Sequence, residues 1–255
     1  MSKQLRTTGT YEWAQETVNC VNGCKHDCRY CYARWNAVDR YQRMGLKDWP
    51  DMRVREKDVR KGYRKYDGVV MFPSTHDVTP EVMGPCLLVL EKLLHHGNEV
   101  LFVSKPHLSV ITEAVSRFAW ATDQLRFRFT VGAVDNEILS YWEPGAPTFQ
   151  ERLQSLQLVF GAGFKTSISA EPLLQPWRVL DLFDRLKPYV NWEFWIGKLN
   201  KADARVKLDD GDRTMLDELL SWQTDEEVMK IVDALKDEPL IKWKDSYKEV
   251  IERCT

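Results

Sequence analysis

The sequence lacks long hydrophobic runs, low-complexity tracts and internal repeats, and its charge is nearly balanced. Its 255 residues include 36 Lys and Arg against 38 Asp and Glu, a formal net charge of −2. A chain with so little net charge has no global field that attracts nucleic acid, so any such contact requires a local basic patch. The N-terminal stretch MSKQLRTTGTYEW contains no apolar run. We therefore expect no signal peptide, no membrane partner and a cytoplasmic location.

Cysteine is scarce and unevenly placed. Four of the six cysteines lie within twelve residues of one another: Cys20, Cys24, Cys28 and Cys31. In a reducing compartment such a cluster indicates metal ligands rather than a disulfide framework. A zinc site is normally built from two separated pairs, and no second pair is present. Cys86 lies in an apolar helical pattern and Cys254 next to the C-terminus, so we interpret them as a core residue and a tail residue.

Short β-rich runs alternate with helical patterns over most of the chain. Six runs are predicted to be strands, at 14–19, 68–73, 99–104, 125–131, 165–170 and 192–197. Helical patterns follow four of them, at 81–96, 108–121, 149–163 and 177–189. Repeated strand–helix units predict an α/β fold with a parallel sheet, and ligands at the carboxyl ends of the strands. Six units are too few for a closed eight-stranded barrel, so we expect an open partial barrel or a doubly wound sheet.

The chain changes character near residue 201. A charged stretch, KADARVKLDDGDR, is followed by two helical patterns near 212–236 and 243–253. We predict one domain over residues 1–200, and a helical extension over 201–255 that packs on its sheet rather than forming a second domain.

The cysteine loop CKHDCRYC, residues 24–31, directly follows the first predicted strand. Three thiolates on one loop can hold three irons of a cubane cluster and leave the fourth iron open to a chelating ligand. Cys20 could supply a fourth ligand, and a fully ligated cluster would only carry electrons. A zinc or redox thiol site is the alternative reading of the loop.

The spacing C-x3-C-x-aromatic-C in this loop resembles the signature of the radical S-adenosylmethionine enzymes. The resemblance implies a partial (βα)6 TIM-like barrel and a 4Fe-4S cluster held by Cys24, Cys28 and Cys31. It also implies that S-adenosylmethionine binds the open iron and that Tyr30 packs against its adenine. Reductive cleavage would then give a 5′-deoxyadenosyl radical that abstracts hydrogen from a substrate, with electrons from a reductant such as flavodoxin or ferredoxin.

Further blocks between about residues 15 and 200 resemble the spore photoproduct lyase branch of that superfamily. These blocks are STHD (74–77), LFVSKPH (101–107), LRFRFTV (125–131), EPGAPTFQERLQSL (143–156) and WIGKLN (195–200). Ser74 stands where the lyase has a cysteine that returns a hydrogen atom to the product radical. A serine O–H bond is stronger than a thiol S–H bond and donates hydrogen atoms poorly. Repair by the lyase mechanism is therefore not expected, and we assign no catalytic residue.

Nine residues, most of them at strand ends, are candidates for binding S-adenosylmethionine. They are Tyr30, Ser74, Thr75, His76, Lys105, Arg128, Thr130, Glu171 and Lys198. Lys105 offers a point charge for the methionine carboxylate. A buried Arg128 needs a carboxylate partner, which that carboxylate or Glu171 could supply. The stretch around Asp77 and Pro80 fits a plain turn and helix start equally well.

The segment Arg53–Tyr66 carries seven basic residues, two acidic residues and two tyrosines. Basic side chains interleaved with aromatic ones suit phosphate neutralisation and base stacking. An exposed helix covering one face of the sheet is the alternative.

Three hypotheses follow from these patterns. The first is a radical S-adenosylmethionine enzyme that modifies or repairs a nucleic-acid base or nucleotide. The second keeps the chemistry but has a peptide or small metabolite as substrate. The third is a non-catalytic iron–sulfur or zinc binding protein on the same scaffold.

Overall fold

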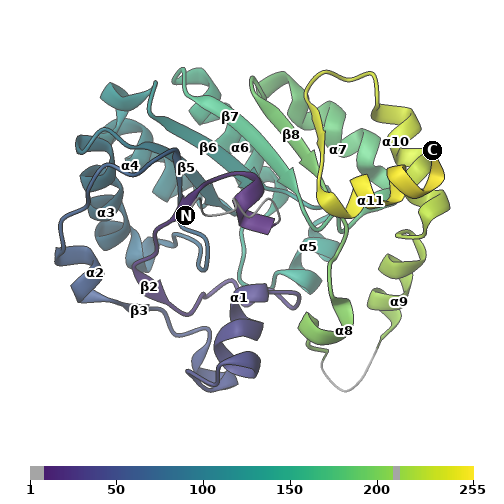
Figure 1. The fold of residues 1–255 in the computed structure, drawn as a ribbon, viewed down its shortest axis with the longest axis horizontal. Helices are drawn as coiled ribbons and strands as arrows, with labels where there is room; N and C mark the ends of the chain where they lie inside the picture. The colour runs from purple at the N-terminus through teal and green to yellow at the C-terminus, as the bar shows by residue number, and fades with distance from the viewer. Residues whose placement is uncertain (1–8, 209–212) are drawn as a thin grey trace, which may run out of the picture.

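The computed structural model of the chain describes residues 9–208 and 213–255. Its centre is one sheet of parallel strands in the order β1-β4-β5-β6-β7-β8-β9 (Figure 1). The strands are β1 (Glu16–Thr17), β4 (Val69–Phe72), β5 (Glu99–Ser104), β6 (Leu125–Thr130), β7 (Lys165–Ala170), β8 (Glu193–Ile196) and β9 (Ile241–Trp243). The six predicted strands are confirmed. Because β1 and β9 pair with one neighbour each, the sheet stays open, as the partial barrel requires.

Helices connect the strands in the predicted alternation. They are α1 (Tyr32–Arg34), α2 (Glu56–Arg60), α3 (Met83–His95), α4 (Leu108–Arg117), α5 (Asn136–Trp142), α6 (Phe149–Gly161), α7 (Val179–Leu186), α8 (Ala202–Arg205), α9 (Thr214–Ser221), α10 (Asp225–Leu235) and α11 (Asp245–Cys254). Short helical turns are η1 (Gly9–Glu12), η2 (Trp35–Arg40), η3 (Leu46–Asp48), η4 (Pro80–Val82), η5 (Ala119–Ala121), η6 (Pro176–Arg178) and η7 (Lys187–Tyr189). Helices α4, α6 and α7 lie behind the sheet in Figure 1, whereas the segment around α1 lies apart from them.

The core forms where the helices pack on the sheet. Phe72, Phe102 and Phe127 lie side by side on neighbouring strands, with ring centroids 6.4 and 5.4 Å apart, and all three are fully buried. Strands covered on both faces form nearly continuous apolar runs, which is why β4 and β5 could be predicted from sequence, whereas β6 was predicted from the alternation of Arg with Leu and Phe. Cys86 is fully buried on α3, so its prediction as a core residue is confirmed.

A second, two-stranded antiparallel sheet pairs β2 (Val21–Asn22) with β3 (Arg53–Val54). The sequence did not predict it. It ties the chain just before the cysteine loop to the start of the basic segment. The alternative of an exposed helix holds for part of the segment only, because the segment contains strand β3 and a five-residue helix, α2 (Glu56–Arg60).

The C-terminal region contains a strand as well as the predicted helices. Strand β9 adds to the sheet beside β8, and Lys244, directly after it, pairs with Glu12 and with Glu171, the latter at 3.3 Å. Lys244 is 3% exposed, so these contacts bury charge between the two ends of the chain. The boundary at residue 200 stays a prediction, and part of the charged stretch at 201–213 lies outside the described residues. Within the described ranges, no helix has the length and apolar character needed to cross a bilayer.

Candidate functional site

The cysteine loop is held against two other loops by close backbone contacts. Gly23 has a φ of +81°, and a Cβ there would lie 2.6 Å from the carbonyl oxygens of Trp49 and Asp51. Only glycine combines that left-handed conformation with so little space. On the other side, the amide of Gly145 donates to the carbonyl of His26 at 3.1 Å. The loop is therefore fixed between the segment after η3 and the one after α5.

Cys24 and Cys28 are buried and Cys31 is half-buried, and all three are free thiols. Burial raises the pKa of each thiol above its ordinary value, and at Cys24 the charge of Asp77 adds to this effect. Backbone amides point at two of the sulfurs: Asp77 N lies 3.5 Å from Cys24 Sγ and Arg34 N lies 3.4 Å from Cys31 Sγ. Such donors are the contacts that stabilise a thiolate bound to a metal group.

The spacing of these sulfurs tests which metal group fits. Among the described residues, two sets of three ligand atoms lie within 4.8 Å of one another, and neither set contains all three sulfurs of the loop. At least one pair is therefore farther apart than the about 3.8 Å between two thiolates on one tetrahedral zinc. The loop suits a larger inorganic group better than a single ion. One of the two sets, Cys24, His26 and Asp77, shares a cysteine with the loop.

Asp77, after β4, is the centre of a polar network beside the loop. Its carboxylate accepts from Ser104 Oγ at 2.9 Å and from Lys105 N at 2.8 Å, and contacts His26 Nδ1 at 2.9 Å. His26 in turn lies 2.9 Å from His107, nitrogen to nitrogen. Burial raises the pKa of Asp77, but the charge of Lys105 and the contact with His26 outweigh it and hold that pKa well below its ordinary value.

A second network joins Tyr30, inside the loop, to α6. The Tyr30 hydroxyl donates to Glu143, and Glu143 pairs with Arg152 at 2.5 Å, with both of these charged side chains fully buried. Lys105 Nζ lies 5.8 Å from the centre of the Tyr30 ring and 3.7 Å from Asp77 Oδ2. Lys105 thus connects the two networks and places a positive charge beside the cysteine loop.

Ser74 and Thr75 lie at the carboxyl end of β4, next to the loop. The Asn19 side chain accepts from the amides of both residues, at 2.8 and 2.9 Å, and donates to Ser74 Oγ at 2.9 Å. The Tyr32 hydroxyl donates to the Ser74 carbonyl. The Ser74 side chain is therefore fixed by Asn19, and the chain two residues beyond Tyr30 reaches the same strand end.

Other predicted residues have partners away from the loop. Arg128 pairs with Glu193 and not with Glu171, because Arg128, Ser167 and Glu193 occupy matching positions on β6, β7 and β8. Glu171 instead faces Lys244.

Three further candidates complete the set. The Thr130 carbonyl accepts a hydrogen bond from Arg152 Nη1 at 3.1 Å. The Lys198 amide donates to Ser246 Oγ, in the C-terminal extension, at 3.0 Å. His76 faces Cys20 rather than the loop, with its Nε2 3.4 Å from the Cys20 amide. The role of all nine residues in binding a cofactor stays a prediction.

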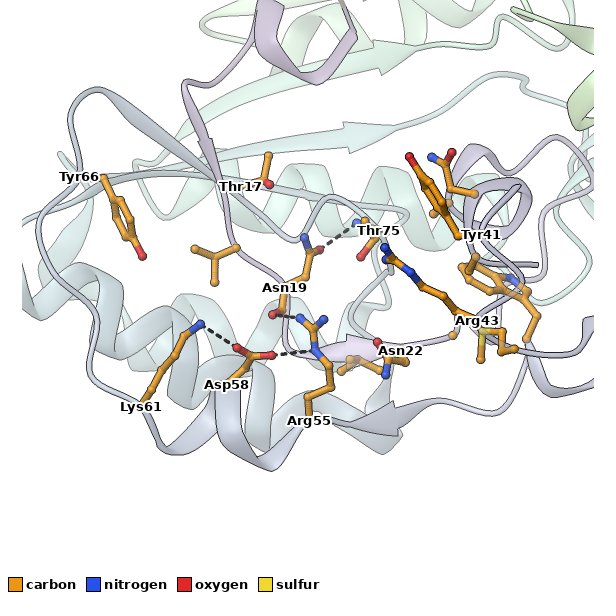
Figure 2. Close-up of a pocket in the computed structure, with 18 residues that line it drawn as sticks. Thr17, Asn19, Asn22, Tyr41, Arg43, Arg55, Asp58, Lys61, Tyr66 and Thr75 are labelled. Carbon is orange, nitrogen blue, oxygen red and sulfur yellow. Dashed lines mark hydrogen bonds and ion pairs between the residues drawn. The ribbon is translucent and has the colours of Figure 1, made fainter. Parts of the chain in front are cut away.

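A cleft of about 530 Å³ opens beside the loop (Figure 2). Its lining carries three basic side chains, from Arg43, Arg55 and Lys61, against one acidic side chain, from Asp58. Arg55 and Lys61 contact Asp58 at 2.8 and 2.7 Å, whereas no ion pair is found for Arg43 among residues 9–208 and 213–255. Lys61 and Tyr66 lie at one end of the cleft in Figure 2 and Tyr41 and Arg43 at the other.

Sequence reasoning missed several residues of this region. His26 could have been found, since it lies inside the CKHDC stretch. Glu143 and Arg152 carry no local signal, because their contacts with Tyr30 and with each other depend on the fold. Arg43 lies outside the basic segment and joins it only through the cleft.

Comparison with known proteins assigns the chain to a family. The sequence profile described as Radical SAM superfamily matches residues 18–176, which is more than half of the chain. A spore photoproduct lyase from Geobacillus sp. (strain Y412MC61) is 23% identical over 178 residues, covering 63% of this chain and 46% of the relative. The match thus spans about half the length of that relative.

Solved structures share the fold. A cysteine-to-alanine mutant of spore photoproduct lyase with dinucleoside spore photoproduct gives a TM-score of 0.57 at 17% identity, covering 95% of this chain and 79% of that one. A tyrosine-to-phenylalanine mutant of spore photoproduct lyase gives 0.58 at 16% identity with the same coverage. Together with the profile match, these similarities show that the chain belongs to the Radical SAM superfamily, in a branch similar to spore photoproduct lyase.

Proposed function

We propose that the chain is a radical S-adenosylmethionine enzyme with a 4Fe-4S cluster on Cys24, Cys28 and Cys31. The observation that carries the proposal is the placement of three free cysteines, two buried and one half-buried, on one loop beside the open parallel sheet, with sulfurs that do not all lie within 4.8 Å of one another. When bound, the reduced cluster and S-adenosylmethionine supply a 5′-deoxyadenosyl radical that abstracts hydrogen from substrate. The superfamily match over residues 18–176 supports the same assignment.

The chain's own residues would bind and orient the cofactor. Lys105, 12% exposed, can neutralise the methionine carboxylate, since its ammonium lies beside the cysteine loop. Tyr30 is held in place by Glu143 and offers its ring to adenine. Ser74 and Thr75, fixed by Asn19, present polar groups at the end of β4. These positions are the candidates to which we assign cofactor contacts.

The proposed substrate is a nucleic-acid base or nucleotide. A solved relative binds a dinucleoside spore photoproduct, by its description. In this chain the basic lining of the cleft and the tyrosines at its two ends support the same substrate class. Basic groups neutralise phosphates, and aromatic rings stack on bases without regard to sequence. Because the overall charge is −2, this local excess of positive charge is what would attract the substrate.

Anaerobic reconstitution tests the chemistry. The full chain, supplied with iron and sulfide, should bind about four irons, as a cubane cluster holds, and release 5′-deoxyadenosine when dithionite and S-adenosylmethionine are added. Cys24→Ala, Cys28→Ala and Cys31→Ala should each abolish release, and Cys254→Ala, at the exposed C-terminus, should not. A full cluster that leaves S-adenosylmethionine intact would contradict the proposal.

Salt-dependent binding tests the substrate class. We expect a fluorescent single-stranded oligonucleotide to bind with an affinity that falls as salt rises. Arg43→Gln with Lys61→Gln should reduce the slope of log K against log salt by about 1.4, since each lost phosphate contact contributes about 0.7. Lys230→Gln, on α10, with Lys236→Gln, directly after it, is the matched control. Release of 5′-deoxyadenosine without oligonucleotide binding would retain the chemistry and reject the nucleic-acid substrate.

A further inference from the structure

Three potential metal ligands meet outside the cysteine loop. Cys20 follows β1, His76 follows β4 and Cys86 lies on α3, and their exposed fractions are 0%, 6% and 0%. Their ligand atoms all lie within 4.8 Å of one another. The three residues come from distant segments of the chain, so their meeting is a property of the fold and not of a sequence motif.

The distance between the two sulfurs favours a shared ion over a disulfide. Cys20 Sγ and Cys86 Sγ are 3.6 Å apart. Two thiolates bound at about 2.3 Å to one tetrahedral ion lie about 3.8 Å from each other. A disulfide requires about 2.05 Å, so the sulfurs would have to approach by about a further 1.5 Å. The two thiols make a sulfur–sulfur hydrogen bond at this distance, which is close to the separation that a bound ion would impose.

The histidine has the orientation of a metal ligand. His76 Nδ1 lies 3.0 Å from the carbonyl oxygen of Asp77. A carbonyl only accepts, so Nδ1 carries the proton and Nε2 keeps its lone pair as an acceptor. The Cys20 amide donates a hydrogen bond to that lone pair at 3.4 Å, and a bound ion would take the place of this contact. A backbone carbonyl that orients one ring nitrogen while the other binds metal is the usual arrangement at protein metal sites.

We propose that Cys20, His76 and Cys86 bind one thiophilic ion with a filled d shell, Zn²⁺ or Cu(I), separately from the group on Cys24, Cys28 and Cys31. Soft thiolate ligands select these ions, and imidazole suits both. Binding displaces the thiol protons to solvent, so two thiolates neutralise a divalent ion in a site where unpaired charge would be costly. The ion would join β1, β4 and α3 directly behind the cysteine loop.

The test removes the loop's ligands first. The full chain carrying Cys24→Ala, Cys28→Ala and Cys31→Ala cannot assemble the proposed cluster, so failure of the proposed function does not affect the result. Titrated anaerobically with Zn²⁺ alone or Cu(I) alone against a competing chelator, it should bind one ion per chain. It should also unfold at a higher temperature when loaded. Binding of only one of the two ions would identify which ion the site takes.

Further substitutions in that background locate the ion. Adding Cys86→Ala or Cys20→Ala should reduce binding to less than a tenth of an ion per chain, whereas adding Cys254→Ala should leave it unchanged. Circular dichroism confirms that each variant folds. Should either variant unfold, X-ray absorption on the parent background decides: two sulfurs at about 2.3 Å and one nitrogen at about 2.0 Å are expected for zinc.

Several results would overturn the proposal. One is no ion bound to the background chain, and another is binding unaffected by Cys86→Ala. X-ray absorption that finds no sulfur ligand on the bound ion would also overturn the proposal. So would a metal-free chain whose mass is lower by two hydrogen atoms, because oxidation of Cys20 and Cys86 to a disulfide, with the two electrons passing to an added oxidant, would then have replaced the metal site.

Discussion

The buried ion pair of Arg152 and Glu143 should be essential for stability, and Arg152→Met tests this. Arg152 Nη2 lies 2.5 Å from Glu143, and its Nε and Nη1 donate to the carbonyls of Pro147 and Thr130 at 2.8 and 3.1 Å. Methionine fills much of the same space but makes none of these contacts. The substitution therefore removes the donor of two carbonyl groups and leaves the Glu143 carboxylate in the interior with the Tyr30 hydroxyl as its donor but without its ion-pair partner.

The expected loss follows from the burial of the pair. Removing one partner of a fully buried ion pair costs about 3–5 kcal/mol, because the other charge remains without compensation. For a chain of this size each kcal/mol lowers the unfolding midpoint by about 2–4 °C, so we expect a decrease of about 6–20 °C. The double variant Glu143→Gln/Arg152→Met should lose less than Arg152→Met alone, since no isolated charge is then left inside.

Thermal unfolding followed by circular dichroism at pH 7 measures the effect. Arg253→Met is the matched control, because Arg253 pairs with Asp225 on the surface, at 2.8 Å. It should leave the midpoint nearly unchanged. A decrease below about 3 °C for Arg152→Met, or one no larger than that of the control, would refute the reasoning that this pair stabilises the fold.

The Glu143–Arg152 pair should also make the stability of the fold depend on pH. Burial raises the pKa of Glu143, but the charges of Arg152 and Lys105 outweigh it and lower that pKa below its ordinary value of 4.5. The folded chain therefore binds fewer protons at this group than the unfolded chain, and the stability it contributes is complete above pH 4.5 and lost as pH falls below it. Glu143→Gln should thus be destabilising at pH 7, by a margin that shrinks in acid.

Two further substitutions follow from the structure. Asn19→Ala removes the acceptor of two backbone amides at the end of β4 and should lower the free energy of unfolding by about 1–3 kcal/mol in urea titrations, while Asn22→Ala, in the exposed part of the cleft, should not. Lys244→Met leaves the carboxylates of Glu12 and Glu171 facing each other. It should cost about 3–5 kcal/mol, and a cost below 1 kcal/mol would mean that the chain relaxes around them.

The fold was largely predictable because its strands are buried. Strands β4 and β5 are apolar over most of their length, so they stand out from the polar connections. Strand β6 alternates Arg with Leu and Phe, and β7 carries Ser and Thr around one Ile, so these two were recognised as short β-rich runs between helical patterns. Strand β9 was missed because three residues, Ile241–Trp243, between two helical patterns carry no periodicity of their own. Its strand conformation comes from pairing with β8, a tertiary contact. The same reason hid β2 and β3, each two residues long.

The candidate site was predictable only where its residues are close in sequence. Cys24, Cys28 and Cys31 lie on one loop, so their spacing could be read directly. The partner of Arg128 could not be predicted from the sequence, because Glu193 lies two strands away in the sheet. Their interaction depends on the register of β6, β7 and β8. A buried arginine does require a carboxylate, but sequence does not say which one.

At Ser74 the resemblance to the lyase predicts that the proposed reaction differs from that of the lyase in its final step. At this position the resemblance places a thiol that returns hydrogen to the product, and the chain has a hydroxyl held by Asn19. Cys86 does not replace it, because its sulfur is fully buried against Cys20. Cys24, Cys28 and Cys31 are the proposed cluster ligands, and Cys254 lies at the end of α11. Five of the six cysteines thus have a proposed role or a buried partner, and Cys254 lies at the end of the last helix. We therefore expect the proposed reaction to end without a cysteine as hydrogen-atom donor at the position of Ser74.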